Sequence, residues 1–382
     1  MNKESSLACH VLSRSGLPLA RKLAKGLAAR PWPAPFGRSV RRCVISAPAR
    51  FAEDGVQPFL RLGDFLAREY RGYAGHVFVG AAGIAVRALA PLLTHKSADP
   101  PVLVLDAAGR FVISLLSGHW GGGNALARHV AGLLAATTVI TTASDAAQCG
   151  EKNCPAIDLL ARDAGLRILD WDTLPKAQAA LLEGRSLRLW DPCFALPLAA
   201  PPHFERLPGG ETDPPAGSDA VYPTVTAHWR FIPPGPGILR LAVPGLCVGI
   251  GCRKNLEPEE VPTAIEELFS EHGLELRAVA ALATVTEKKE DASIRRAMEK
   301  LNVPLYDFSA NALSRCPAPH PSTAAGKRFA CPPFSVCEAA ALRCAGRLGG
   351  PAWLLLPKRV IRRRVTLAVA LASSASNNGG QA

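Results

Sequence analysis

From about residue 76, short apolar runs alternate along the chain with segments whose apolar residues have helical spacing. The run HVFVG (76–80) ends in glycine, and the runs PVLVLD (101–106) and FVISLL (111–116) flank a turn that contains Gly109. The clearest helical stripe that follows them consists of Leu126, Val130, Leu133 and Leu134. This alternation predicts an α/β fold with a mainly parallel, doubly wound sheet.

A second pattern of the same kind begins near residue 241 and continues to about residue 372. Its expected elements, in chain order, are a strand and loop in LCVGIGCRKN (246–255), a helix through Ile265, Leu268 and Phe269, a strand in AVAALATV (278–285), a strand in VPLYDFS (303–309), a helix in SVCEAAALRCAG (335–346) and strands in AWLLLPK (352–358) and VTLAVAL (365–371). The sequence therefore predicts two α/β domains with mainly parallel, Rossmann-like layers.

The stretch between the two patterns differs in composition. It opens with a segment that predicts two amphipathic helices around a short strand, and it continues into residues 195–238, where prolines are frequent and no periodicity is apparent. The predicted organisation is an N-terminal α/β domain (1–147), a middle segment with a proline-rich linker (148–240), a C-terminal α/β domain (241–372) and a disordered tail (373–382).

The charge balance indicates the class of partner. The formal net charge is +12, which favours anionic ligands. Only 6% of the residues are aromatic, and no basic stretch is interleaved with them as single-stranded nucleic acid requires. A small molecule with several carboxylates or phosphates is thus at least as well supported as nucleic acid.

The eleven cysteines form no CxxC pair, which is the spacing that zinc ribbons and thiol redox sites use. We therefore expect reduced thiols and no protein metal site. No apolar stretch of signal-peptide length precedes Cys9, and no window approaches the length of a membrane span. These features predict a cytoplasmic protein that does not interact with membranes.

A glycine-rich segment, SGHWGGGN (117–124), follows one predicted strand and opens a helix. Such a loop exposes backbone N–H groups at a helix N-terminus, where an anionic group binds favourably. His119 is the candidate acid or base, and Ser117 is a candidate nucleophile, although no G-x-S-x-G elbow is present and no acidic partner can be assigned. Asn124 fits a helix cap better than a catalytic amide. The loop residues predicted to contact substrate are Gly118, Gly121, Gly122 and Asn124.

A second glycine loop follows the strand at residues 76–80. It contains Gly80 and Gly83, with Arg87 one turn into the helix. It is neither a GxGxxG motif nor a phosphate loop, so nucleotide binding is weakly supported. Arg87 is predicted either to clamp a substrate carboxylate or to lie on a solvated helix face.

The second domain offers four further candidates for substrate binding. Arg253 and Lys254 follow a strand at its carboxyl end, where open α/β sheets bind ligands. Lys358 begins the basic run KRVIRRR, which also fits a solvated turn between strands. Glu338 invites a catalytic interpretation, but Ser335-x-x-Glu338 before an apolar helix is equally a capping box.

Taken together, GAAGIAVRALAPLL, DPPVLVLDAAGRFVISLLSGHWGGGNALAR and TVITTASD, followed by GIGCRKN, ALATVT, SVCEAAAL and LLLPKR, resemble the CbiG family over roughly residues 10–370. The resemblance implies a cobalt-precorrin-5A hydrolase of anaerobic cobalamin biosynthesis. Such an enzyme opens the δ-lactone of a cobalt-corrinoid ring and releases acetaldehyde to give cobalt-precorrin-5B. The substrate is a polycarboxylate, which suits the basic charge, and it carries the cobalt itself, so no further cofactor is implied.

On this interpretation, water attacks the lactone carbonyl, N–H groups of the glycine loop stabilise the oxyanion, and His119 moves protons. Family members open with an apolar strand, whereas this chain begins with the largely polar MNKESSLACHVL. The sequence therefore does not decide whether this segment forms the first strand. A homodimer and contacts with neighbouring corrinoid-pathway enzymes are also left open.

Two alternatives stay open. One is a nucleotide-binding α/β enzyme with a different reaction, against which the missing phosphate-loop lysine counts. The other is a non-catalytic protein that binds a corrinoid, another tetrapyrrole or nucleic acid through its charge. Affinity for duplex DNA that falls steeply with salt would favour nucleic acid, and tight binding of a polycarboxylate macrocycle would favour a tetrapyrrole.

Overall fold

The structure is a computed structural model, and the chain divides into two compact units, residues 1–159 and 160–382. No helix in the part of the chain that the structure describes is long and apolar enough to cross a membrane. The predicted boundary at residue 147 and the predicted tail lie outside the described residues. The structure describes residues 5–35, 37–51, 53–142, 155–196, 203–207 and 223–372.

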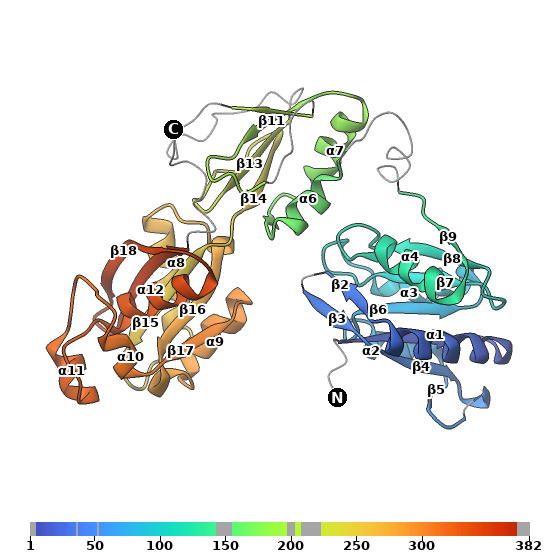
Figure 1. The fold of residues 1–382 in the computed structure, drawn as a ribbon, viewed down its shortest axis with the longest axis horizontal. Coiled ribbons are helices and arrows are strands. Elements are labelled where there is room, and N and C mark those ends of the chain that lie inside the picture. The colour runs from blue at the N-terminus through green and yellow to red at the C-terminus, as the bar shows by residue number, and fades with distance from the viewer. Residues whose placement is uncertain are drawn as a thin grey trace. The chain divides into compact units, whose positions relative to one another are not determined.

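The first unit is built on one seven-stranded sheet (Figure 1). Its strands, in spatial order, are β5 (Val56–Phe59), β4 (Arg42–Pro48), β1 (Ser6–Val11), β6 (Gly75–Val79), β7 (Val102–Leu105), β8 (Phe111–Leu116) and β9 (Thr137–Val139). The first five are mutually parallel, whereas β8 runs antiparallel to β7 and β9 pairs with β8 in parallel. A small hairpin of β2 (Trp32–Ala34) and β3 (Arg38–Val40) accompanies the sheet. The predicted mainly parallel, doubly wound sheet is confirmed.

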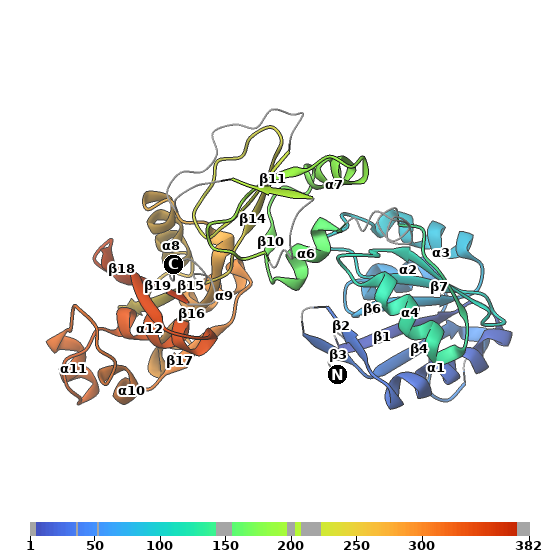
Figure 2. The same cartoon turned by 45° about the horizontal axis from the view of Figure 1, so that its top comes forward.

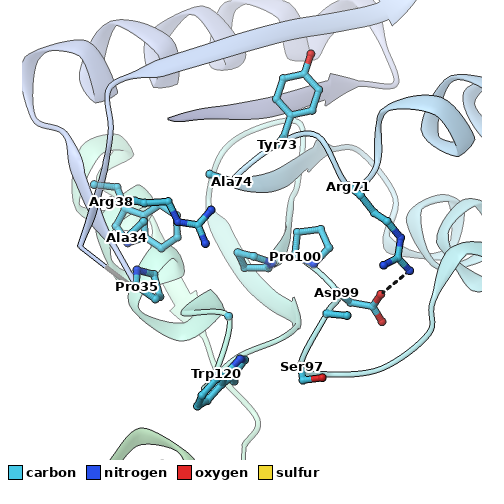
Figure 3. A pocket seen from close by; sticks show the side chains of 14 residues that line it. Ala34, Pro35, Arg38, Arg71, Tyr73, Ala74, Ser97, Asp99, Pro100 and Trp120 are labelled. Atoms are coloured by element: carbon cyan, nitrogen blue, oxygen red, sulfur yellow. Dashed lines mark ion pairs between the residues drawn. The ribbon is translucent and has the colours of Figure 1, made fainter. Parts of the chain in front are cut away.

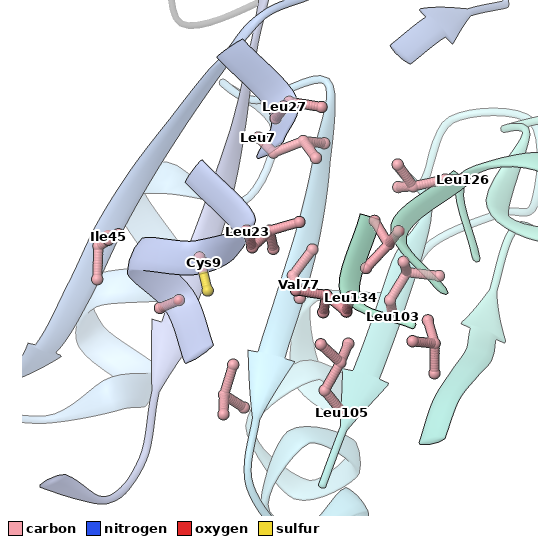
Figure 4. Close-up of a cluster of buried hydrophobic side chains, with 14 of the residues drawn as sticks. Leu7, Cys9, Leu23, Leu27, Ile45, Val77, Leu103, Leu105, Leu126 and Leu134 are labelled. Carbon is pink, nitrogen blue, oxygen red and sulfur yellow. The ribbon is translucent and has the colours of Figure 1, made fainter. Parts of the chain in front are cut away.

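Helices cover both faces of this sheet. Helices α1 (Leu17–Ala29) and α4 (Gly123–Leu134) bury their apolar stripes against one face, together with strand residues such as Val77 and Leu103 (Figure 4). Helices α2 (Leu62–Glu69) and α3 (Ala82–Leu89) pack on the other face, against Phe78 and Val104. The alternation of these strand residues between the two cores follows from the period-two geometry of a strand. The stripe predicted for α4 is confirmed, with Leu133 partly buried beside the core.

The polar start of the chain nevertheless forms a central strand. β1 pairs with β4 on one side and β6 on the other, and all six of its residues are buried. Its buried polar side chain His10 is accommodated because Ser46 and His76 on the flanking strands supply hydrogen bonds at 2.8 and 2.9 Å. The sequence alone did not predict this strand, because the partners of its polar residues lie on other strands.

The second unit contains two sheets (Figure 2). The first consists of β10 (Arg167–Ile168), β14 (Ile238–Ala242), β13 (Thr224–His228), β11 (Leu187–Trp190) and β12 (Phe204–Arg206), in that order. Helix α7 (Leu174–Leu182) packs against β11, and α6 (Ile157–Asp163) precedes this sheet in the chain.

The expectation that residues 195–238 are only a linker is wrong. This range contains β12, β13 and the first residue of β14, and β13 is paired on both sides and wholly buried. The described prolines of this range, including Pro223, Pro233 and Pro234, lie outside the strands, as the loss of an N–H donor requires. Their frequency concealed short strands that depend on pairing with distant parts of the chain.

The remaining sheet of the second unit has the order β17 (Leu305–Phe308), β16 (Val279–Val285), β15 (Leu246–Cys252), β19 (Val365–Ala372) and β18 (Ala352–Ile361). Its first three strands are parallel, and β19 and β18 complete it as an antiparallel hairpin. Its helices are α8 (Glu260–Glu271), α9 (Ala292–Leu301), α10 (Ala310–Ser314), α11 (Thr323–Phe329) and α12 (Val336–Leu348). The predicted second α/β pattern is confirmed, with mixed strand directions.

Helix α12 lies unusually close to β15. A Cβ atom added to Gly249 would lie 1.8 Å from the carbonyl oxygen of Cys337 in the first turn of the helix. Only glycine allows this approach. Small residues on α12, among them Ala340 and Ala341, are fully buried against the sheet. The glycine in GIGCRKN is thus required for packing, and it sets where the helix begins relative to the strand.

Candidate functional site

The glycine loop 117–122 connects β8 to α4 and closes on itself through hydrogen bonds. The N–H groups of Gly122, Gly123 and Asn124 each donate at 2.9 Å to carbonyl groups of residues 119, 117 and 118 respectively. Because these three donors are already used, they are not available to stabilise an oxyanion. The prediction that the start of this helix binds an anionic group therefore cannot rest on these three N–H groups.

The glycines of this loop are needed for close packing. Added Cβ atoms would lie 2.6 Å from Asn124 Oδ1 at Gly118, 2.7 Å from Ser117 Cβ at Gly121 and 2.7 Å from Pro35 Cγ at Gly122. Gly122 also has a φ of 81°, in the left-handed region that favours glycine. Their presence is explained without a ligand.

Two polar side chains predicted for catalysis or binding have structural partners instead. The hydroxyl of Ser117 donates to the carbonyl oxygen of Asp99 at 2.8 Å rather than to His119. Asn124 is buried as the second residue of α4, and its amide donates to Thr142 Oγ1 at 3.0 Å. The cap position belongs to Gly122, so the interpretation of Asn124 as the helix cap is wrong.

His119 is paired with a carboxylate that the sequence did not reveal. Its Nδ1 lies 3.4 Å from Oδ1 of Asp158, and the two side chains are only 16% and 15% exposed. A carboxylate at this position orients the imidazole and stabilises its protonated form. Asp158 lies far along the chain from His119, so no local motif could have linked them. The pair has the composition of a general acid–base centre.

A cavity of about 180 Å³ adjoins the same loop, and we call it the loop pocket (Figure 3). Its lining includes Trp32, Arg38, Arg71, Asp99, Trp120 and Gly121. Arg71 lies 3.8 Å from Asp99 and also donates to Thr94 Oγ1 at 2.8 Å. Thr94 in turn donates its N–H to the Asp99 carboxylate. A positive charge in this pocket is therefore balanced by an adjacent negative one.

The second glycine loop is not part of this arrangement. Because β8 is antiparallel to β7, the loop 117–122 lies at the edge where β6 and β7 begin, whereas Gly80 lies where β6 ends. Gly80 donates to Leu105 and approaches Leu12, and exposed Arg87 folds back over Gly83. The two sets of residues predicted to bind substrate are thus at opposite edges of one sheet.

The second unit has a cavity of about 380 Å³ at the carboxyl end of β15, which we call the basic pocket. Its lining combines Cys252 and Arg253 after β15, part of α11, the start of α12 and the β18–β19 hairpin. Its cationic side chains are Arg253, Arg328, Lys358, Arg363 and Arg364, and no acidic residue lines it. The structure thus brings Arg253 and Lys358 together, as residues at one site should be, and leaves exposed Lys254 outside the lining.

Most of these cations have no acidic partner. Arg364 pairs with Glu260 at 2.9 Å and donates to the carbonyl oxygen of Asn255. Among the described residues, no carboxylate forms an ion pair with the other four, Arg253, Arg328, Lys358 and Arg363. The basic pocket is therefore strongly favourable for anions.

Comparison with protein families identifies the chain. The family descriptions "Cobalamin synthesis G N-terminal", "Cobalamin biosynthesis central region" and "Cobalamin synthesis G C-terminus" match residues 64–145, 155–208 and 246–370. A cobalt-precorrin-5A hydrolase from Salmonella typhimurium is 31% identical over 81% of this chain and 84% of its own length. The chain belongs to the CbiG family. A second relative, the cobalt-precorrin-5A hydrolase of Priestia megaterium, is 27% identical over 72% of this chain and 74% of that protein.

Among solved structures, a cobalamin biosynthesis protein G homolog from Sulfolobus solfataricus aligns over 97% of this CbiG chain and 98% of that chain, with 20% identity and a TM-score of 0.37.

Glu338 of this CbiG protein is held by hydrogen bonds to neighbouring parts of the second unit. Its side chain is fully buried and accepts hydrogen bonds from the N–H groups of Lys358 and His320 and from the His320 ring, at 2.9, 3.1 and 2.7 Å. Burial alone would raise the pKa of Glu338, but these donors and the Ser335 hydroxyl outweigh it and lower the pKa. Glu338 does not line the basic pocket, and Ser335 makes no side-chain cap bond, so the substrate-binding and capping-box interpretations both give way to a role in joining β18 to α12.

No disulfide joins the cysteines that the structure describes; Cys149 and Cys154 lie outside the described residues. Within the described ranges, no group of three or more His, Cys, Asp or Glu side chains is arranged to hold a metal ion.

Proposed function

We propose that this protein is a cobalt-precorrin-5A hydrolase that opens the δ-lactone and releases acetaldehyde to give cobalt-precorrin-5B. The observation that carries the proposal is the 31% identity, over 81% of the chain, to a relative of that name. Cobalt then enters as part of the substrate, and the proposal requires no further cofactor. The proposed compartment is the cytoplasm. A homodimer and contacts with neighbouring pathway enzymes stay predictions of the sequence.

In the proposed reaction, His119 takes a proton from water as the water oxygen attacks the lactone carbonyl carbon. The ring C–O bond then breaks, and the imidazolium returns the proton to the departing oxygen, which leaves a carboxylic acid and an alcohol. Asp158 supports this role because a carboxylate 3.4 Å from Nδ1 stabilises the transient imidazolium. In the second step the freed alcohol loses its O–H proton as the bond between its carbon and the ring breaks. The bonding electrons stay on the ring carbon, which takes up a proton, and acetaldehyde leaves.

Two details of the structure refine this mechanism. Because the Ser117 hydroxyl donates to Asp99, we propose water rather than Ser117 as the nucleophile. Because three N–H groups of the glycine loop are bonded within the loop, we do not assign oxyanion stabilisation to them. Arg253 and Lys358 are still proposed to bind substrate carboxylates. Substrate binding by Arg87, at the opposite edge of the first sheet, stays a prediction.

The test is an anaerobic incubation of the purified protein with cobalt-precorrin-5A, in which the ring product is followed by mass and released acetaldehyde is trapped. The proposal expects aldehyde in proportion to a lactone-opened product, and neither in a reaction without protein. Tight binding without chemical change would overturn it in favour of a non-catalytic corrinoid-binding protein. Failure to bind would reopen the nucleotide-binding alternative.

A further inference from the structure

The basic pocket contains more positive charge than its surroundings balance. Arg328 on α11 and Arg363 in the β18–β19 turn join Arg253 and Lys358, and among the described residues no carboxylate forms an ion pair with any of these four side chains. Four like charges around one cavity repel one another. An anionic ligand with several negative groups would relieve that repulsion.

The backbone adds to the same field. Val336 and Cys337, the first residues of the 13-residue helix α12, line the pocket, so its partially positive N-terminus faces the cavity. Gly249 makes this possible, since any larger residue there would push the first turn of α12 away from β15. The first turn of α12 also carries the buried carboxylate of Glu338, which offsets part of this field, so the positive potential of the pocket comes mainly from its arginine and lysine side chains.

The pocket also has apolar surface between its charges. Phe329, Val336 and Val360 line it, and Val360 is 60% exposed. Bare phosphate has nothing to place against such groups. An alkyl carboxylate matches both features, because its methylene groups contact the apolar side chains while its head pairs with arginine or lysine.

The volume limits how much of a ligand enters. At about 380 Å³ the cavity is near the lower end of the roughly 300–1,000 Å³ typical of small-molecule sites. A corrinoid macrocycle carries acetate and propionate chains around its whole rim. The cavity therefore suits a group of these chains rather than the ring.

We propose that the basic pocket is a carboxylate-binding subsite that anchors acetate and propionate chains on one edge of the macrocycle. This inference rests on the proposed function for its ligand. It adds Arg363, which belongs to the basic run KRVIRRR, and Arg328, which no sequence motif indicated. Arg328 and Arg363 bind carboxylates through two parallel N–H donors, and Lys358 acts as a point charge. Substrate affinity then depends on residues of the second unit that do not take part in bond breaking.

The test uses the full chain and the metal-free porphyrin uroporphyrin, which has eight carboxylate side chains, with affinity measured by fluorescence titration at about 0.15 M salt. We expect Arg328→Gln and Lys358→Gln each to raise Kd roughly tenfold, the effect of losing one charge-assisted hydrogen bond. Coproporphyrin, with four carboxylates, should bind more weakly to the wild type. Thermal unfolding of each variant checks that the fold is retained.

Lys327→Gln is the matched control. Lys327 neighbours Arg328 on α11 and is also exposed, but it lines a different hollow of the surface and not the basic pocket. The substitution removes the same charge, and we expect Kd to stay within about twofold of the wild type, since only non-specific attraction changes. An equal loss in Lys327→Gln and Arg328→Gln would overturn the proposal, because general charge attraction would then explain binding.

A triphosphate competitor separates the two sources of negative charge. If inorganic triphosphate binds more tightly than uroporphyrin and loses affinity in Arg328→Gln, the pocket is a phosphate site and the carboxylate assignment is wrong. The outcome is also distinct from that of the proposed function. If the enzyme turns over cobalt-precorrin-5A but substitutions in the basic pocket leave binding unchanged, only this inference is wrong. If those substitutions weaken binding but no turnover occurs, only the hydrolase assignment is wrong. In an active enzyme, Arg328→Gln should raise KM and leave kcat nearly unchanged.

Discussion

The loop pocket and the basic pocket both contain arginine, but they differ in how the charge is balanced. In the loop pocket, Arg71 lies 3.8 Å from Asp99, and Thr94 holds both residues in place. In the basic pocket, no carboxylate among the described residues forms an ion pair with the side chain of Arg328 or Lys358. A balanced pocket is suited to orienting a reacting group, and an unbalanced one to attracting anions. His119 lies in the loop next to the first of these pockets but is not among the residues that line it.

Glycine has a similar role in both regions. In the loop 117–122 it allows the loop to fold onto Asn124 and Pro35, and in β15 it allows α12 to contact the strand. Neither case requires a ligand near the glycine. A glycine before a helix therefore indicates close packing at least as strongly as it indicates anion binding, and the surrounding charges decide between the two.

The largest expected effect concerns the first side of this comparison. His119→Ala should lower kcat by roughly 100-fold to 10,000-fold, the usual contribution of a general acid or base. Binding of uroporphyrin should stay within about twofold, because the change leaves the basic pocket intact. His129→Ala is the control, since His129 is a half-buried histidine on α4 whose ring bonds to the carbonyl oxygen of Arg30. Near-normal turnover by His119→Ala would remove the catalytic half of the comparison.

A second prediction concerns the frame of the basic pocket. Gly249→Ala places a methyl group 1.8 Å from the Cys337 carbonyl oxygen, so the free energy of unfolding should fall by about 3 kcal/mol. Gly346→Ala on the exposed side of α12 meets no atom within 4 Å and should instead stabilise the protein by about 0.5–1 kcal/mol. Denaturant unfolding of the two variants measures both effects. Equal stability of the pair would show that the close contact between β15 and α12 does not form.

The third prediction is a pH dependence, and it begins with a buried hydrogen-bond chain in the first unit. His76 Nε2 must donate to the carbonyl oxygen of Tyr70, so its Nδ1 accepts from His10 Nε2, and His10 Nδ1 accepts from the Ser46 hydroxyl. This arrangement requires both rings to be neutral. Burial lowers the pKa of His76 to about 4 and lowers that of His10 well below its usual value.

The sign follows from proton binding. Between pH 6.5 and about 4, His76 is protonated in the unfolded chain but stays neutral in the folded state. The stability that is present above pH 6.5 is therefore lost as the pH falls. For His76 alone the loss at pH 5 is about 2 kcal/mol, and His10 adds to it. In the second unit, burial lowers the pKa of His228 to about 4 as well. Amide hydrogen exchange at pH 5 and 7.5 should show a steeper loss of protection in the first unit than in the second, and the reverse order would contradict this account.

Local patterns in the sequence predicted much of the fold because they report on neighbouring residues. The stripe on α4 and the strands around residues 76–116 and 246–252 follow from hydrophobic spacing alone. Arg253 was found because the end of a parallel strand is a general place for ligands. Arg328 was missed because a short helix in a proline-containing segment carries no such signal.

By itself the sequence determined the α/β class, the two strand and helix patterns and the resemblance to the CbiG family, since each depends on ordered local motifs. Tertiary structure alone decided that β1 is central, that β12 and β13 belong to a sheet, and that His119 lies beside Asp158. It also decided that one glycine loop closes on itself and that the two loops lie at opposite edges. The physical reason is that strand pairing, ion pairing and burial join residues far apart in the chain, whose partners no local pattern specifies.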